Sequence, residues 1–409
     1  MVAGFQGNRG RREHCQYVYR HPEGILPVKA GHKKGHQGES RRDHRRAVGC
    51  YAQVFPQELS EIEGLNLIAG NTLKGQLPKI LADLPKASEP RLALEDFCDP
   101  TPFELLPVEG LSGRTRAFLK IQDGCESFCS YCIVPYARGP LRSLESSEVV
   151  SLVRSLSEQG YKEVVLTGIH LGKYGADLKP AIDLKDLLHL IGKERLPLRV
   201  RLSSIEPKEI DQALIEVIAS EDWLCRHLHI PLQSGDDRIL DRMNRAYKAM
   251  EFAKLVEDIH ERVPLAAIGV DVMAGFPGED DRAYRNTFSL VRGLPVSYLH
   301  VFPFSPRAGT PASGFDGRVN EKEIKRRTEE LRELGRKKRE AFYRSCLGKS
   351  FMVLAEGWES EEKKMIKGLS DNYIRVLFLS PRLIKNEMVS VVIERWDNQG
   401  VFGNMAESD

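Results

Sequence analysis

Three of the eight cysteines in this 409-residue chain stand within eight consecutive positions. Cys125, Cys129 and Cys132 form a C-x3-C-x2-C pattern, and the sequence offers no fourth ligand close to them. In a chain without a secretory signal, this spacing indicates metal binding before disulfide formation. A structural zinc site normally has four protein ligands, whereas three thiolates suit a [4Fe–4S] cluster whose fourth iron binds a small molecule. We therefore predict an iron–sulfur cluster here, with structural zinc as the alternative.

Short strands alternate with amphipathic helices around this pattern, from Arg116 to about Phe315. The strands that we expect are Ala117–Gln122, Glu163–Thr167, Leu198–Leu202, His227–Leu232, Ile268–Met273 and Leu299–Phe304. Six strand–helix units at this spacing predict an α/β fold with a partial parallel (β/α)6 barrel. Ligands bind such folds at the carboxyl ends of the strands, and the cysteine loop leaves the first strand at that end. The predicted fold therefore places the three thiols where a catalytic site is expected.

The rest of the chain divides by composition. Residues 47–100 have a globular pattern, with an apolar stretch at Leu65–Ala69, and residues 101–114 resemble a linker because of their prolines and glycines. We assign residues 111–340 to the barrel core. Residues 345–405 return to short strands without helices between them, which predicts a small antiparallel β-barrel of the oligonucleotide-binding type. Residues 1–46 hold almost no periodic apolar pattern, and we expect them to be disordered or anomalous.

Charge and hydropathy limit the classes of protein. The net charge is only +2, so bulk charge alone does not predict a nucleic-acid partner. Residues 1–46 carry 11 of the 60 Lys and Arg residues but 4 of the 58 acidic ones, so the remaining chain is slightly acidic. No apolar run approaches the roughly 18 residues that a membrane helix needs. We predict a cytoplasmic protein that does not bind a membrane.

Several other residues could ligate metal by type but lack a supporting pattern. Histidines at the ends of expected strands are His170, His227, His229 and His300. We expect them to be hydrogen-bonded scaffold or pocket-lining groups, with His227 and His229 on opposite sides of their strand. Cys225 and Cys346 are isolated, and we expect both to be small buried hydrophobic residues.

Sequence motifs beyond the cysteines allow a closer interpretation. They are Cys132–Gly139, Leu166–Gly172, Arg201–Pro207, His229–Gly235, Asp271–Glu279 and His300–Ser305. Together with the cysteine pattern they resemble the radical S-adenosylmethionine methylthiotransferases. Within that family they resemble the branch that acts on threonylcarbamoyladenosine in tRNA. The resemblance covers about residues 47–400.

The resemblance implies a specific chemistry. A [4Fe–4S] cluster on Cys125, Cys129 and Cys132 would pass an electron to S-adenosylmethionine, giving a 5′-deoxyadenosyl radical. That radical would abstract a hydrogen from C2 of the modified adenosine next to the anticodon, at tRNA position 37. A second, auxiliary [4Fe–4S] cluster would carry the methylated sulfur. Gly168 and Ser203, at strand ends, are our candidates to lie near S-adenosylmethionine, and turn residues without ligand contact are the alternative for both.

The resemblance also implies two partners. One is a tRNA, bound through its anticodon stem-loop, and the other is an electron donor such as flavodoxin or ferredoxin. The C-terminal barrel would correspond to the TRAM-like barrel with which the family holds tRNA. Lys349, Lys367 and Arg375 are candidates to contact phosphates there, which would position the substrate without reading its sequence. A role in solubility is the alternative for each of these side chains.

The chain departs from the family in its first domain, which normally supplies three cysteines for the auxiliary cluster. Cys50 stands in a matching context, whereas Cys15 does not. A shift of one nucleotide in the codons of Cys15–His21 permits Val-Asn-Thr-Cys-Thr-Val-Thr, the motif of the family, with its cysteine at Val18. We therefore interpret residues 1–46 as an out-of-frame translation and residues 47–100 as the remnant of an incomplete N-terminal α/β domain. A genuine basic RNA-binding tail is the alternative.

Two other functions remain open from the sequence. The first is a methylthiotransferase that acts on isopentenyladenosine or on a ribosomal protein. The motifs at Thr167–His170 and His229–Pro231 favour the threonylcarbamoyl branch over both, by resemblance alone. The second is a non-catalytic RNA-binding remnant that has lost the auxiliary cluster.

Overall fold

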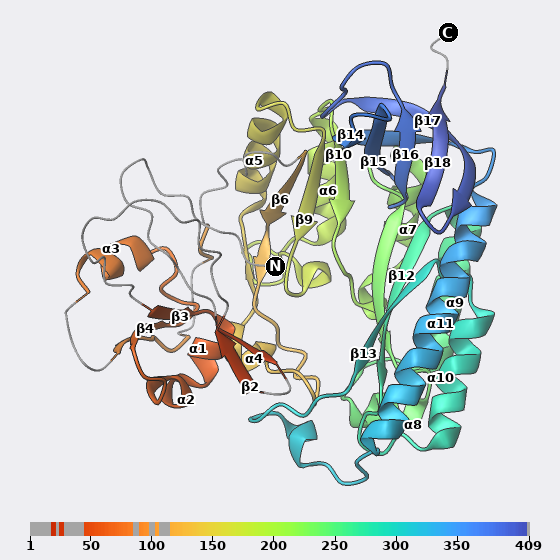
Figure 1. Ribbon diagram of the computed structural model, residues 1–409. Coiled ribbons are helices and arrows are strands. Elements are labelled where there is room, and N and C mark those ends of the chain that lie inside the picture. The colour runs from red at the N-terminus through yellow and green to blue at the C-terminus, as the bar shows by residue number, and fades with distance from the viewer. Residues whose placement is uncertain are drawn as a thin grey trace. The chain divides into compact units, whose positions relative to one another are not determined.

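The computed structural model describes residues 18–21, 24–27, 45–84, 90–97, 103–105 and 115–406 (Figure 1). The chain forms two compact units. The N-terminal unit comprises Met1–Leu106 and Ile133–Pro140, and the core unit comprises Pro107–Cys132 and Leu141–Asp409. Sequence analysis included residues 133–140 in the barrel core, but they group with the N-terminal unit. Of residues 1–46, which we expect to be disordered or anomalous, 18–21, 24–27 and 45–46 are described and lie in strands, and the rest lie outside the described residues.

The N-terminal unit contains a parallel sheet in the order β3 (Arg45–Val48), β4 (Leu65–Ala69), β5 (Arg91–Ala93). Its described helices are α1 (Cys50–Val54), α2 (Pro56–Ser60), α3 (Leu77–Ala82) and α4 (Val134–Arg138), and β1 (Val18–His21) pairs with β2 (Gly24–Pro27). Leu65 and Ile68 of β4 pack into one apolar cluster, and Leu67 and Ala69 pack into another. A central parallel strand covered on both faces requires such a continuous apolar sequence. In Figure 1, α3 and α2 lie on opposite sides of this sheet.

The core unit holds two parallel sheets of three strands. The first has the order β6 (Arg116–Lys120), β9 (Glu163–Thr167), β10 (Arg199–Leu202), and the second has the order β11 (His227–Gln233), β12 (Ala267–Ala274), β13 (Tyr298–Pro303). An isolated parallel bridge joins Val200 to Leu224 between them. All six expected strands are therefore present and parallel. The first is shorter than predicted, because β7 (Gln122–Asp123) turns away to pair with β8 (Arg142–Ser143) in antiparallel fashion.

Helices connect these strands and fix where each loop ends. They are α5 (Ser146–Glu158), η1 (Leu171–Lys173), α6 (Leu184–Lys193), η2 (Pro207–Glu209), α7 (Gln212–Ser220), α8 (Asp237–Arg242), α9 (Ala249–Arg262) and α10 (Asp281–Gly293). Four of them begin at an aspartate whose carboxylate accepts a backbone N–H of the first turn: Asp183, Asp211, Asp236 and Asp280. Such N-caps satisfy donors that the helix leaves free and so define the start of each helix. Among the described residues, no helix has both the length and the apolar character needed to cross a bilayer.

The C-terminal part of the core unit is a small closed barrel. After η3 (Pro311–Gly314), α11 (Glu321–Ser345) packs on β13 and leads to β14 (Ser350–Ser360), β15 (Met365–Ser370), β16 (Arg375–Leu379), β17 (Met388–Asp397) and β18 (Gly400–Met405). The strand order is β14-β15-β16-β18-β17, and Val353, Ile366 and Phe378 lie in its core. The predicted small barrel is confirmed. The prediction that it is wholly antiparallel is wrong, because β16 and β18 pair in parallel to close it.

A buried ion network joins this barrel to the first parallel sheet. Glu163 of β9 is fully buried and accepts hydrogen bonds from Arg199 Nε at 2.7 Å and Arg201 Nε at 2.8 Å. The remaining guanidinium N–H groups donate to barrel carbonyls at 2.7–2.9 Å: Met352, Leu369, Ser370 and Asp371. Burial raises the pKa of Glu163, but the two arginines outweigh burial and hold that pKa at about 2. The carboxylate therefore neutralises two cations that together bridge the sheet and the barrel.

Candidate functional site

The cysteine loop follows β7, and contacts to the residues after α8 fix its backbone. Asn244 Nδ2 donates to the carbonyls of Ser127 and Phe128 at 3.2 and 3.0 Å, and Ser130 N donates to the carbonyl of Met243 at 3.0 Å. Phe128 has φ 44°, in the left-handed region where L-residues are strained. The loop is therefore held in a defined turn by hydrogen bonds to a segment more than a hundred residues away.

None of the three loop cysteines forms a disulfide, and Cys129 is buried while Cys125 and Cys132 are partly exposed. The amide of Cys132 donates to the carbonyl of Cys129 at 2.9 Å, which fixes the turn between these two residues. The structure thus presents three cysteine sulfurs on one short loop that hydrogen bonds hold in place, as the sequence predicts. Their role as cluster ligands stays a prediction.

A histidine stands beside Cys125. His170 Nδ1 is 3.4 Å from Cys125 Sγ and 3.3 Å from Ser127 Oγ, and His170 Nε2 is 2.5 Å from Glu209 Oε1. Burial lowers the pKa of His170, but its bonds to Cys125 and Glu209 outweigh burial and raise that pKa to about 9. Burial raises the pKa of Cys125, but hydrogen bonds from His170 and Ser127 bring it below its ordinary value. This environment favours a thiolate, which is the form that binds iron.

An arginine stands beside Cys129. Arg245 Nη1 is 3.3 Å from Cys129 Sγ and 3.1 Å from Glu206 Oε1, and its Nη2 pairs with Glu206 Oε2. The Tyr247 hydroxyl contacts Arg245 Nε at 3.2 Å and lies 2.7 Å from the Leu232 carbonyl. Arg245 is about nine-tenths buried, so its charge acts on the sulfur with little screening by water.

Gly168 and Ser203 lie at the strand ends where the sequence places them. A Cβ on Gly168 would come within 3.0 Å of Gln122, whose Oε1 accepts the His170 amide at 2.7 Å. Gly168 therefore has a steric reason to lack a side chain. Ser203 is different, because its Oγ is buried and has no hydrogen-bond partner among the described residues. A buried hydroxyl without a partner is costly and indicates a missing ligand or water.

Cys50 belongs to the N-terminal unit and begins α1. Arg138 Nε donates to its Sγ at 3.2 Å, and Asn71 Nδ2 lies 3.5 Å from the same sulfur. Asn71 Nδ2 also donates to the carbonyl of Ala137 at 2.6 Å, which ties α4 to this position. Cys15 and the codon-shifted cysteine at Val18 lie outside the part of the chain whose side chains are described. The role of Cys50 as an auxiliary ligand stays a prediction.

The structure corrects the interpretation of the strand histidines. His227 Nε2 and His229 Nδ1 both contact the Tyr298 hydroxyl, at 2.8 and 3.2 Å, so they face the same side of β11 and not opposite sides. Side chains alternate along a strand, so residues two positions apart lie on the same face, and the sequence prediction placed them on opposite faces in error. His229 Nε2 also bonds Asp271 at 2.8 Å, and His300 Nδ1 lies 3.5 Å from the same oxygen. His227 and His229 are buried and hydrogen-bonded, whereas His300 is about half exposed, and the expectation that these histidines are scaffold or pocket-lining groups rather than metal ligands stays a prediction. The burial of Cys225 and Cys346 is confirmed.

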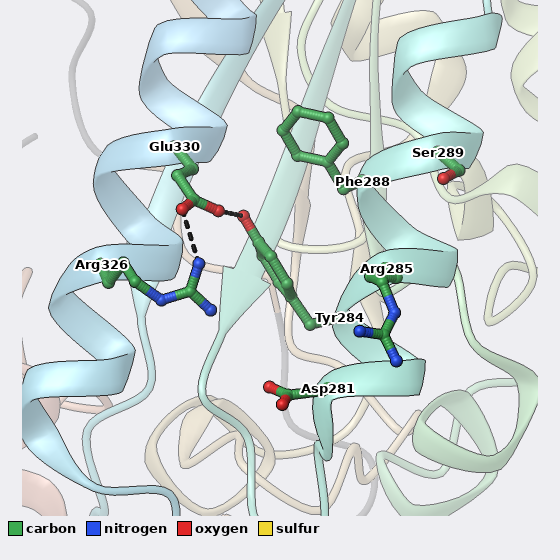
Figure 2. A pocket seen from close by; sticks show the side chains of 7 residues that line it. All are labelled: Asp281, Tyr284, Arg285, Phe288, Ser289, Arg326 and Glu330. Carbon is green, nitrogen blue, oxygen red and sulfur yellow. Dashed lines mark hydrogen bonds and ion pairs between the residues drawn. The ribbon is translucent and has the colours of Figure 1, made fainter.

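A surface hollow of about 290 Å³ lies between α10 and α11 (Figure 2). Three of its polar side chains contact one another, since Glu330 accepts from the Tyr284 hydroxyl at 2.6 Å and from Arg326 at 2.5 Å. Asp281, Arg285, Phe288 and Ser289 complete its lining, and no thiol lies among them. The concentration of free thiols and cationic donors therefore identifies the cysteine loop, and not this hollow, as the candidate site.

Comparisons with known proteins agree with this assignment. Residues 119–291 match the Radical SAM superfamily. The threonylcarbamoyladenosine tRNA methylthiotransferase MtaB of Aquifex aeolicus (strain VF5) is 39% identical over 331 residues, which span 81% of this chain and 78% of that protein. The chain belongs to the radical S-adenosylmethionine methylthiotransferase family. The resemblance found from the motifs is thereby confirmed.

Other relatives of this methylthiotransferase extend the match. MtaB of Bacillus subtilis (strain 168) is 35% identical over 91% of this chain and 86% of its own. A tRNA-2-methylthio-N(6)-dimethylallyladenosine synthase of Dictyoglomus thermophilum is 33% identical over 88% of this chain and 83% of its own. The solved structure of the radical S-adenosylmethionine methyltransferase TsrM of Kitasatospora setae is 18% identical with a TM-score of 0.50, over 66% of this chain and 59% of that one. That likeness supports the fold alone. The superfamily uses a [4Fe–4S] cluster and S-adenosylmethionine.

Proposed function

We propose that this chain thiomethylates C2 of N6-threonylcarbamoyladenosine in tRNA, next to the anticodon. The observation that carries the proposal is the loop with three cysteines outside any disulfide, after the carboxyl end of the first parallel strand, in a chain 39% identical to an enzyme named for this reaction. Relatives named as dimethylallyladenosine synthases are 32–35% identical, below the 39% of MtaB of Aquifex aeolicus, which favours the threonylcarbamoyl substrate. The six parallel strands are proposed to act together as the partial (β/α)6 barrel that the sequence predicts.

The donor set fits a three-thiolate [4Fe–4S] cluster. We propose that Cys125, Cys129 and Cys132 hold it, since none of them forms a disulfide and the first two have nitrogen donors beside the sulfur that favour the thiolate form. When bound, the cluster supplies an electron for the reductive cleavage of S-adenosylmethionine. Flavodoxin or ferredoxin is the proposed source of that electron. Ser203 is proposed to contact S-adenosylmethionine, which would give its buried hydroxyl a partner, and Gly168 is proposed to keep the adjoining turn narrow.

The C-terminal barrel is proposed to hold the anticodon stem-loop, as a TRAM-like domain. Lys349 and Arg375 are exposed on it and are positioned to meet phosphates. Lys367 is already paired with Glu359 at 2.9 Å, so its contribution should be smaller. The N-terminal unit offers Cys50 as a ligand for the auxiliary cluster, where the family resemblance implies three cysteines. We therefore propose that the chain as printed holds one cluster, and that residues 1–46 do not restore the second.

The proposal is tested with the full chain after anaerobic reconstitution. The assay measures 5′-deoxyadenosine release and, by mass spectrometry, the methylthio derivative of tRNA that carries threonylcarbamoyladenosine. Replacing any one of Cys125, Cys129 or Cys132 by Ala should abolish 5′-deoxyadenosine release, since two thiolates hold a four-iron cluster poorly. Cys225→Ala is the matched control, because this cysteine is buried outside the loop. Undiminished release in any of the three loop variants would contradict the cluster assignment.

The substrate is tested in parallel. The printed chain should release 5′-deoxyadenosine without methylthiolating tRNA, and a version with the N-terminal cysteines of the family restored should methylthiolate threonylcarbamoyl-tRNA. As the control for substrate choice, the same restored protein is assayed with tRNA that carries isopentenyladenosine. Preference for isopentenyl-tRNA would show that the threonylcarbamoyl assignment is wrong. Binding of tRNA without any 5′-deoxyadenosine release would favour the non-catalytic remnant.

A further inference from the structure

Two of the three loop cysteines share the same three-part arrangement, in which a carboxylate holds a nitrogen donor against a sulfur. At Cys125 the donor is His170, with its Nδ1 3.4 Å from Sγ and its Nε2 2.5 Å from Glu209. At Cys129 the donor is Arg245, with its Nη1 3.3 Å from Sγ and both of its terminal nitrogens paired with Glu206. The sequence does not predict either arrangement, because its members come from separate loops.

Both carboxylates belong to one short segment after β10. Glu206 directly precedes the 3-10 helix η2 and Glu209 is its last residue, and the Glu209 amide donates to the Glu206 carbonyl at 3.0 Å. The Ile205 amide donates to the His229 carbonyl at 3.0 Å, which ties the segment to β11. Lys208 lies between the two glutamates in sequence but is exposed and pairs with Glu251 at 2.8 Å. This one turn thus directs both carboxylates toward the donors beside Cys125 and Cys129, and it directs the Lys208 side chain toward Glu251.

The two donors act in a region that water screens weakly. The side chains of His170 and Glu209 are 7% and 9% exposed, and that of Arg245 is 5% exposed. At such burial, a charge a few ångströms away interacts far more strongly than it does in bulk water. A carboxylate behind a donor fixes its orientation and keeps it aimed at the sulfur, as outer partners do for metal ligands in general. Glu206 and Glu209 therefore act on the sulfurs through other residues.

We propose that Glu206 and Glu209 are positioning residues that, through Arg245 and His170, set how readily the cluster on the loop cysteines accepts an electron. The inference rests on the proposed role of Cys125 and Cys129 as cluster ligands. One-electron reduction adds one negative charge and neither makes nor breaks a bond to a protein atom. Hydrogen bonds and positive charge at a ligand sulfur stabilise the more negative, reduced form and raise the reduction potential. His170 at Cys125 and Arg245 at Cys129 would each stabilise the reduced cluster by donating a hydrogen bond to a ligand sulfur.

The test is a redox titration of the anaerobically reconstituted full chain, without tRNA. Dithionite and mediator dyes set the potential, and the electron paramagnetic resonance signal of the reduced cluster is integrated. Glu206→Asp and Glu209→Asp keep the negative charge but shorten the side chain that holds each donor, so each should lower the ratio of reduced to oxidised cluster at a fixed potential by about threefold. The double variant should lower it by about tenfold, which is about 59 mV for a one-electron couple. Lys208→Ala is the matched control, because it alters the same turn without touching either donor.

Two further comparisons distinguish an effect on the reduction potential from a simple loss of bound cluster. Arg245→Lys retains a positive charge and should stay closer to the native potential than Arg245→Gln. A variant that binds less iron is measured on its loaded fraction, since a midpoint potential does not depend on the amount of cluster. Native midpoint potentials in both glutamate variants and in their double variant would overturn the proposal. Failure of the unaltered chain to bind about four irons would instead overturn the cluster assignment itself.

Discussion

Replacing Glu163 by Gln tests the buried ion network that joins the first parallel sheet to the C-terminal barrel. The substitution keeps the shape of the side chain but leaves Arg199 and Arg201 without a counter-charge, while both still reach the barrel carbonyls. The pKa of Glu163 falls from 4.5 to about 2 in the folded protein. At about 1.4 kcal/mol per pKa unit, the network contributes roughly 3 kcal/mol to the free energy of unfolding at neutral pH. Removing one partner of a buried ion pair costs a similar amount, about 3–5 kcal/mol.

Guanidinium unfolding provides the measurement. Trp358 and Trp396 lie in the barrel strands β14 and β17, so their fluorescence reports loss of barrel structure. Glu163→Gln should lower the free energy of unfolding of the barrel transition by roughly 3 kcal/mol. Glu158→Gln, an exposed glutamate at the end of α5, is the control and should change it by less than about 0.5 kcal/mol. An equally small effect of Glu163→Gln would refute the reasoning, because the two arginines would then need no counter-charge.

Three further predictions concern the pH dependence at Glu163 and the residues Asp211 and Gly168. The stabilisation from Glu163 is present above its ordinary pKa of 4.5 and is lost as the pH falls towards about 2, so the unfolding midpoints of the native chain and Glu163→Gln should converge on acidification; a constant gap would contradict this. Asp211→Ala removes the acceptor of the Leu214 amide at the start of α7 and should cost about 1 kcal/mol by thermal unfolding, whereas exposed Asp222→Ala should not. Gly168→Ala pushes Gln122 away from the His170 amide and should slow 5′-deoxyadenosine release while costing about 1–3 kcal/mol of stability, and native release would show that the turn has room to spare.

Much of the core could be predicted from the sequence because its signals are local. Each parallel strand is a short apolar run bounded by polar or glycine-rich turns, and Glu163–Thr167 was predicted with its observed bounds. The C-x3-C-x2-C loop needs no tertiary information to be recognised as a metal-binding pattern. Ser203 could be placed at a strand end, but the absence of a partner for its hydroxyl depends on packing that the sequence does not show.

The parts that escaped prediction depend on distant residues or on strand geometry. Glu209 reaches His170 across 39 positions, and Arg245 reaches Cys129 across 116, so no local pattern indicates either pair. The parallel closure of the C-terminal barrel by β16 and β18 is likewise a choice of topology and not of propensity. The error at His227 and His229 has a different source, since counting positions along the strand would have placed both on one face.

The assignment of Ile133–Pro140 to the N-terminal unit has a consequence for modularity. The chain leaves the core directly after Cys132 and returns to it at Leu141, while Asn71 holds the Ala137 carbonyl. A genetic cut after Leu106 would therefore strip the shorter fragment of α4 and leave the longer one with a segment whose packing partners are gone. The N-terminal unit is consequently not a cassette that truncation, fusion or domain shuffling can remove cleanly. Cys132 of the cysteine loop and helix α4 of the N-terminal unit are encoded by one continuous stretch of the gene. A rearrangement that exchanges the N-terminal unit would therefore have to preserve this stretch.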